Sequence, residues 1–186
     1  MFGKMFVSAE HKTFGARAVE VLATFALWWF SMQVVWHVLK FSGLNFAEIG
    51  GDTPVAGFTL NYWLHSHNLT FGQAIASPSV DVVMGTLITM FGAPFLEEVL
   101  FRGFFCSVAS DENGNLKARG LFTVLVGSFI LFGLVHGHWY YSVMLQGVGG
   151  LWLARLWFRN GPSQKWSYFS CVAAHCLYNI SVLASG

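Results

Sequence analysis

The stretch VDVVMGTLITMFGAPFLEEVLFRGFFCSVA, residues 80–109, decides the fold. It is mostly apolar and is longer than the about 20 residues that a helix needs to cross the hydrocarbon core of a bilayer. It nevertheless contains Glu97, Glu98 and Arg102. An ionisable side chain at the centre of a membrane helix costs about 2.5–3.5 kcal/mol on insertion scales, so such groups are rare there and usually functional. The stretch therefore predicts a membrane helix that carries part of a functional site.

The composition of the whole chain points the same way. Of its 186 residues, 55% are hydrophobic and 10% are charged, whereas a soluble domain carries about 25% charged residues. The 19 Phe and 8 Trp residues are typical of apolar cores and of membrane interfaces. A formal net charge of +1 gives no reason to expect a nucleic-acid partner. We therefore expect one transmembrane domain over residues 1–186, surrounded by the lipid bilayer.

Five segments come close to the length and hydrophobicity of a transmembrane helix. The first is too long for a signal peptide, and no cleavage site follows it closely. The connection 41–79 holds a weakly apolar patch that is too short to span, and we place it at the interface or as a re-entrant segment. The predicted fold is an all-α integral membrane protein, a bundle of about five transmembrane helices at 18–40, 80–109, 119–138, 140–158 and 166–184.

The basic residues predict the orientation of this bundle. Cytoplasmic ends of membrane helices carry an excess of Lys and Arg. With a cytoplasmic N-terminus, Lys40 is the basic residue on the outer side. The other nine of the 10 Lys and Arg residues fall on or toward the cytoplasmic side: Lys4, Lys12, Arg17, Arg102, Lys117, Arg119, Arg155, Arg159 and Lys165.

Two adjacent carboxylates in the second segment are predicted to differ in role. Neighbouring residues on a helix are rotated by about 100°, so Glu97 and Glu98 should face different surroundings. Glu98 and Arg102 are four residues apart and can form a structural ion pair on one face. A carboxylate in a low-dielectric pocket can act as a base near neutral pH.

Three more polar groups lie in the later segments. His136 is near the end of the third, while His175 and Asn179 are four apart in the fifth and share a face. At about 1.5 Å per residue, these groups and Glu97 lie roughly 15–25 Å from the cytoplasmic linkers. Helix tilt and a break near Pro94 would bring them together near the membrane midplane.

The same residues form three motifs in a fixed order. Glu97-Glu98-Val99-Leu100-Phe101-Arg102 resembles the EExxxR motif of the CAAX-protease and bacteriocin-processing (CPBP) family of membrane proteases. Phe132-Gly133-Leu134-Val135-His136 is similar to its FxxxH motif, and His175-Cys176-Leu177-Tyr178-Asn179 to its HxxxN motif. Each motif lies on a separate predicted helix, and the resemblance covers a catalytic core of about 80–184.

This resemblance implies an intramembrane protease that hydrolyses a peptide bond without a covalent enzyme intermediate or a cofactor. Glu97 and His136 would activate a water, and His175 with Asn179 would stabilise the oxyanion. Neutral N–H donors aimed at a developing oxyanion gain strength where bulk water is excluded. The implied substrate is a membrane-anchored protein or peptide that is processed at its C-terminus or matured. The small size of the chain favours a bacterial inner (cytoplasmic) membrane.

Three alternatives use the same residues. Two histidines and a glutamate form a recognised catalytic zinc set, although the sequence has no HExxH and the ligands would come from three helices. Intramembrane carboxylates and histidines also form proton relays in transporters. The sequence shows no inverted repeat, which argues against a transporter. A non-catalytic bacteriocin-immunity protein has no evident need for all four polar groups.

The five-span arrangement makes a direct prediction about topology. A reporter fused after Gln164 should lie in the cytoplasm, and a reporter fused at Gly186 should lie outside, because one span separates them. A pair of reporters that signals by enzymatic activity on only one side of the membrane would measure this. Signals from the same side for both fusions would contradict the arrangement.

Overall fold

The computed structural model describes residues 12–42, 80–136, 139–160 and 164–185. Most of these residues are helical, and none of the described residues belongs to a β-strand. The all-α class is therefore confirmed for this part of the chain. The segment predicted at 41–79 to be interfacial or re-entrant lies outside the described residues from position 43 onward.

Helices occupy all five of the predicted ranges. The first is α1, Phe14–Phe41, and the last two are α10, Trp139–Arg159, and α11, Gln164–Ser185. The second is a composite helix over 80–109, and the third is a composite helix over 120–135, in which π-helical turns (η) alternate with α-helix. Their parts are α5 (Val80–Leu87), η2 (Ile88–Gly92), α6 (Ala93–Glu98), η3 (Val99–Phe104) and α7 (Phe105–Ala109), then α8 (Gly120–Val124), η4 (Leu125–Leu131) and α9 (Phe132–Val135).

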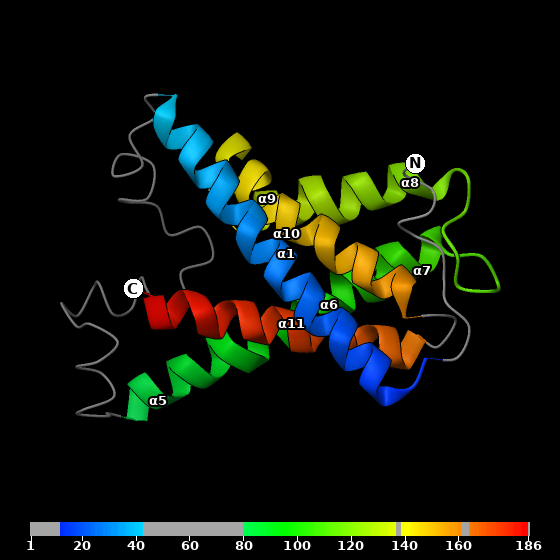
Figure 1. Ribbon diagram of the computed structural model, residues 1–186, viewed down its shortest axis with the longest axis horizontal. Helices are drawn as coiled ribbons and strands as arrows, with labels where there is room; N and C mark the ends of the chain where they lie inside the picture. Colours follow the sequence, from blue (N-terminus) through cyan, green and yellow to red (C-terminus); the bar gives the residue numbers. More distant parts are fainter. Residues whose placement is uncertain (1–11, 43–79, 137–138, 161–163, 186) are drawn as a thin grey trace.

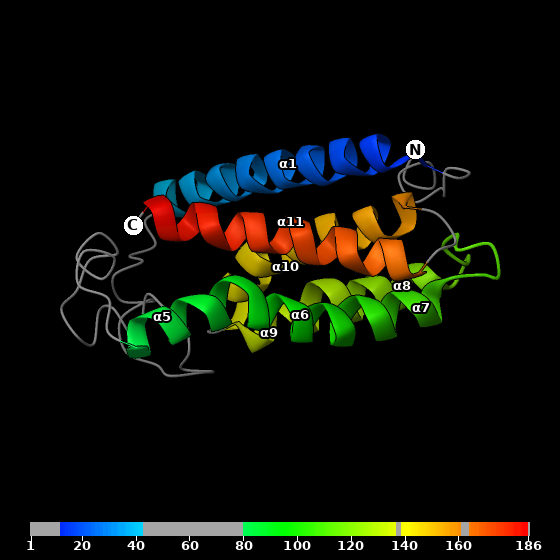
Figure 2. The same ribbon diagram turned by 90° about the horizontal axis from the view of Figure 1, so that it is seen from below.

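Successive helices run in opposite directions (Figures 1 and 2). The start of α1, the turn between α7 and α8, the end of α10 and the start of α11 lie at one end of the bundle. The end of α1, the start of α5 and the end of α11 lie at the other. In the turn, Gly114 has a positive φ of 76°, a conformation that glycine adopts readily. Five antiparallel helices of this kind are what the predicted topology requires.

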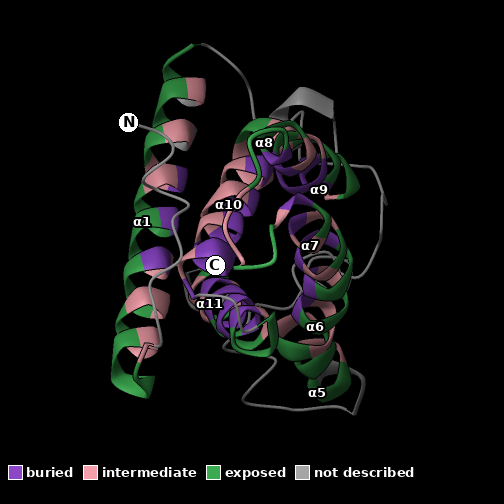
Figure 3. Ribbon diagram, turned by 90° about the vertical axis from the view of Figure 1, so that its right-hand side faces the viewer, coloured by how far each residue is buried: buried purple, intermediate pink, exposed green. Residues whose placement is uncertain are grey.

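Two of the helices are long and apolar enough to cross a membrane, over Phe14–Leu39 and Val83–Ala109, and the helix Gly120–Val135 is apolar but shorter. Their outer faces carry large apolar side chains that the protein leaves uncovered, such as Leu96 at 75% and Phe122 at 74% exposure. Figure 3 shows the exposed faces of α1 and of α5 to α7 turned away from the buried centre. Apolar surface of this extent is suited to lipid. The number of spans stays a prediction.

The buried centre is built around α10. Its residues Leu153, Ala154, Leu156 and Phe158 are fully buried, and the helix packs against α1, α9, η4 and α11. Contact with η4 is close, because a Cβ added at Gly150 would overlap the carbonyl oxygen of Ser128. Small residues allow helix backbones in membranes to approach in this way.

The predicted break near Pro94 does not occur, because α6 continues directly from η2. Pro94 stands at the start of α6, and the preceding turn widens so that the N–H of Ala93 donates to the carbonyl of Ile88 five residues back. Proline has no N–H and its ring crowds the carbonyl four residues earlier. The chain accommodates the proline by a π-turn, a feature frequently found at functional sites.

Candidate active site

The carboxylate of Glu97 lies between two imidazole rings. Its Oε2 atom is 3.1 Å from Nε2 of His136 and 3.7 Å from Nε2 of His175. The three side chains come from α6, from the residue that ends α9, and from the middle of α11. Glu97 and His136 are 26% and 20% exposed, and His175 is 5% exposed. Three of the four residues predicted to be catalytic thus meet at one oxygen atom in a partly open site.

The tautomer of His136 follows from its own backbone. Its Nδ1 is 2.6 Å from the carbonyl oxygen of Phe132, and because a carbonyl can only accept, Nδ1 carries the proton. The Nε2 atom of a neutral His136 is then an acceptor that faces the acceptor oxygen of Glu97. Two acceptors at 3.1 Å need a proton between them, carried either by the imidazole ring or by the carboxyl group.

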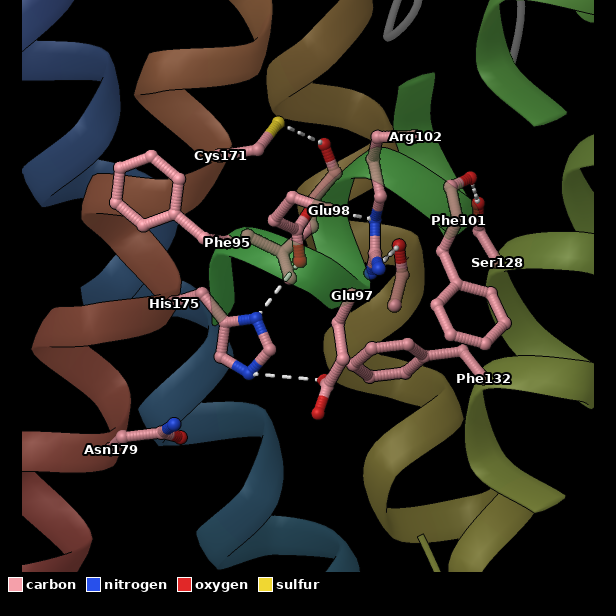
Figure 4. A network of polar contacts seen from close by, with 12 residues as sticks. Phe95, Glu97, Glu98, Phe101, Arg102, Ser128, Phe132, Cys171, His175 and Asn179 are labelled. Atoms are coloured by element: carbon pink, nitrogen blue, oxygen red, sulfur yellow. Dashed lines mark hydrogen bonds and ion pairs between the residues drawn. The ribbon is translucent and has the colours of Figure 1, made fainter. Parts of the chain in front are cut away.

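Glu98 joins the ion pair that the sequence predicts and also contacts the site. Its Oε2 is 3.2 Å from Nε of Arg102, and both side chains have no exposed surface. Arg102 also donates from Nη2 to the carbonyl oxygen of Gly150 on α10, at 3.2 Å. The other oxygen of Glu98, Oε1, accepts a hydrogen bond of 2.8 Å from Nδ1 of His175. Figure 4 shows Glu98 between the arginine and the histidine.

The contact between Glu98 and His175 is a functional feature that the sequence reasoning missed. The two carboxylates were expected to face different surroundings, yet they contact the two nitrogens of one imidazole ring. The ring of His175 enters between diverging side chains and reaches both. Spacing along one helix carries no signal for this contact, since the ring comes from another helix. An ionised carboxylate only accepts, so Nδ1 of His175 carries a proton and Nε2 of the neutral ring is an acceptor.

Asn179 lies apart from the Glu97 contacts, one helical turn along α11 from His175. Its Nδ2 donates to the carbonyl oxygen of Thr89 in η2, at 2.9 Å. The N–H of Ala93 bonds to the carbonyl of Ile88, five residues back. The same spacing would pair the carbonyl of Thr89 with the N–H of Pro94, but proline has no N–H. Figure 4 shows the side chains of Asn179 and His175 extending from α11 to the same side. A side-chain amide has two N–H donors, so this bond commits one of them.

Phe132, the first residue of the FxxxH motif, contacts three of the polar groups. Its ring centroid is 4.4 Å from that of His136 and 5.9 Å from that of His175. The guanidinium carbon of Arg102 lies 4.3 Å from the same centroid, within the range of a cation–π contact. The phenyl ring therefore separates the buried Glu98–Arg102 pair from the more open side of the site.

The donor atoms of Glu97, His136 and His175 are of the types that catalytic zinc uses. Among the residues that the structure describes, no group of three or more His, Cys, Asp or Glu side chains is spaced to hold a metal ion. Glu98 at Nδ1 of His175 would suit either chemistry, since carboxylates orient both catalytic and metal-ligating histidines. The choice between zinc and a metal-free site therefore needs an experiment.

Fold and site together define a helical membrane protein with a buried cluster of glutamate and histidine. The model of the type II CAAX prenyl endopeptidase Rce1-like family matches residues 79–181, more than half of the chain. The protein therefore belongs to this family of membrane-embedded endopeptidases, in agreement with the resemblance seen in the motifs. No curated protein and no solved structure matches the chain significantly.

The burial of Glu98 predicts a large loss of stability on its neutralisation. Glu98→Gln leaves Arg102 buried without a counter-charge, which should cost about 3–5 kcal/mol for a fully buried pair. We expect a lower yield of folded protein and a clearly lower melting temperature in detergent. Glu112→Gln, in the exposed turn after α7, is the matched control and should melt like the unmodified protein. Equal melting temperatures for both variants would show that the pair does not hold the fold.

Proposed function

We propose that the protein is an intramembrane endopeptidase in which Glu97 and His136 activate a water and His175 with Asn179 stabilises the oxyanion. The observation that carries this proposal is the position of Glu97 Oε2, within 3.1 and 3.7 Å of two imidazole nitrogens on two other helices. Membership of an endopeptidase family supports the class of reaction. The residue roles rest on the geometry and on the motifs.

The first step is attack by water on the peptide carbonyl. A water enters beside Glu97 and His136 and separates their side chains, which are in direct contact at 3.1 Å in the structure. It donates one O–H to Oε2 of the carboxylate and the other to Nε2 of the neutral ring. Since Nδ1–H of His136 is bound to Phe132, Nε2 is the atom left to accept. Glu97 takes the proton as the water oxygen bonds to the carbonyl carbon, and the carbonyl π electrons move to oxygen. A positioned general base contributes about 10²–10⁴-fold to such a step.

The second step is collapse of the tetrahedral oxyanion. His175 can donate from Nε2 only as an imidazolium, because its other proton is held by Glu98. The carboxylate of Glu98 lies at the far nitrogen of that ring, the arrangement of the carboxylate and histidine in catalytic triads. Asn179 has one N–H bound to Thr89 and a second donor for the oxyanion. The proton on Glu97 passes to the amide nitrogen as the C–N bond breaks, which gives a carboxylic acid and an amine.

The substrate is proposed to be a membrane-anchored or lipidated protein or peptide, cleaved near its C-terminus. This proposal is supported by the position of the site on helices whose outer faces are apolar. Because such faces contact lipid, a substrate held in the bilayer can approach the site from the side. We place the protein as a multi-pass protein of a bacterial inner membrane with a cytoplasmic N-terminus. The family name makes a prenylated CAAX peptide the first probe to test, beside the same peptide on an acyl anchor.

Loss of the base should abolish turnover and keep the fold. With purified protein in lipid discs and a prenylated CAAX peptide, we expect Glu97→Gln to lower kcat by at least about 10²–10⁴-fold. Its melting temperature should stay near that of the unmodified protein, because Glu97 is partly exposed and glutamine keeps the shape. An active Glu97→Gln beside a folded, inactive Glu98→Gln would reverse the two roles. Unmodified protein that cleaves neither peptide would favour the transporter or immunity alternatives.

Asn179 separates a metal-free mechanism from a zinc mechanism. Asparagine is a poor zinc ligand, but removal of one oxyanion donor usually costs about 10²–10³-fold in turnover. We expect Asn179→Ala to lose activity on this scale, and Ser181→Ala, whose hydroxyl donates to the carbonyl of Tyr178 in its own helix, to keep it. Protein purified in chelator should remain active and contain no stoichiometric metal. One zinc per chain, with activity that follows its removal and return, would make His136 and His175 ligands instead.

A further inference from the structure

The helix α1 lies outside the residues that match the family, yet one of its side chains reaches the site. Most large apolar side chains of α1 are uncovered, such as Leu27 at 40%, Trp29 at 45% and Phe30 at 62% exposure. Trp28, between them, is fully buried. The buried residues Thr24 and Met32 lie one turn before and one turn after it, so Trp28 is at the centre of the face of α1 that packs against the rest of the bundle.

The partners of Trp28 are two aromatic residues of α11. Its ring stacks on Tyr178 with centroids 3.9 Å apart and planes 6° apart. It also meets the ring of His175 at 5.6 Å and 61°, within the range of favourable edge contacts between aromatic rings. On α10, a Cβ added at Gly149 would overlap the indole. Glycine at 149 thus makes the space that lets Trp28 reach His175.

The imidazole of His175 is therefore held by groups from three other helices. Glu98 of α6 binds Nδ1, Phe132 of α9 meets the ring at 5.9 Å and 66°, and Trp28 of α1 supplies the remaining aromatic contact. With these contacts in place, Nε2 is directed to Glu97. Loss of one ring contact would let the imidazole rotate about its side-chain bonds, and Nε2 would no longer point toward Glu97.

The position of α1 is fixed by polar contacts that are independent of Trp28. Near the start of the helix, Oε1 of Glu20 accepts from Lys12 at 2.8 Å and from Nη2 of Arg159 at 2.8 Å. Near its middle, Nε1 of Trp152 donates to Oγ of Ser31 at 3.0 Å. The bonds from Arg159 and Trp152 join α1 to α10, so replacing Trp28 removes a contact with the site while other contacts of the helix remain.

We propose that Trp28 is a positioning residue for His175, so that α1 is part of the catalytic unit although the family match begins after it. The inference rests on the proposed function, in which Nε2 of His175 donates to the oxyanion. An interaction realised only in the transition state changes kcat more than KM. Disturbing Trp28 should therefore lower kcat and leave KM for the peptide nearly unchanged.

Three variants separate positioning from general packing. Trp28→Ala should lower kcat by on the order of 10–100-fold, the scale of a misplaced catalytic group, at a temperature where the protein is folded. Trp28→Phe keeps an aromatic ring and should stay within about threefold of the unmodified kcat, since the indole Nε1 has no hydrogen-bond partner among the described residues. Met32→Ala, which opens the same core cluster one turn further along α1, should lower the melting temperature and keep kcat.

A second readout does not depend on activity. In protein labelled with 5-fluorotryptophan, Trp28→Phe identifies the fluorine signal of Trp28 among the signals of the 8 tryptophans. We expect His175→Asn to move this signal, and His37→Asn, at an exposed position on the same helix, to leave it in place.

The outcomes distinguish this inference from the proposed function. A Trp28→Ala variant with unchanged kcat, or a Met32→Ala variant as impaired as Trp28→Ala, would overturn the positioning role while the peptidase stands. A Trp28 signal that ignores His175→Asn would overturn the contact itself. Unmodified protein that cleaves no peptide would remove the proposed function, and a fluorine signal that still responds to His175→Asn would leave the contact in place. If Trp28→Ala does not fold, Trp28→Leu takes its place in the same comparison.

Discussion

The fully buried carboxylate of Glu98 is the constraint on which the rest of the site depends. A charge without exposed surface inside a membrane protein must be paired and hydrogen-bonded. Glu98 meets this need with Arg102 on its own composite helix and with His175 on α11, and Arg102 in turn binds a backbone carbonyl of α10. Three helices are thus tied together at one ion pair. The same bond that satisfies the charge decides which nitrogen of His175 faces the carboxylate of Glu97, so the stability of the bundle and the geometry of the site share one interaction.

Much of the fold could be predicted from the sequence, because it follows from local properties. Apolar length and polar linkers placed all five helices within a few residues of their ends, since both are properties of contiguous sequence. The convergence of Glu97, His136 and His175 could also be predicted. An isolated ionisable group in an apolar helix is costly, so such groups usually pair with one another. The same reasoning predicted a break at Pro94 where the structure has a π-turn. A proline signals that the regular pattern must change, but the way in which it changes depends on the neighbouring helices.

The remaining features of the site could not be predicted, because they depend on contacts between helices. Glu98 and His175 are 77 positions apart, and nothing in the neighbourhood of either residue indicates the other. The same holds for Trp28, which resembles the exposed neighbours Leu27, Trp29 and Phe30 in sequence and differs from them in burial. The prediction of five membrane spans is supported in part: among the described residues, two helices are long and apolar enough to cross a membrane. The helices α10 and α11, which carry the core and half of the site, are more polar than a helix that must face lipid on all sides.

The polar side chains of the three motifs are held in place mainly by hydrogen-bond partners that lie outside those motifs. Asn179 is held by the carbonyl of Thr89, and Arg102 by the carbonyl of Gly150. Backbone carbonyls have no side-chain signature, so the sequence shows these partners only indirectly, through Pro94 and through glycines that let helices approach. A chain that carries the three motifs without these supports would hold the same side chains in other directions. Whether a relative is a protease should therefore depend on the supports as much as on the motifs, and α1, which lies beyond the family match, is one of them in this protein.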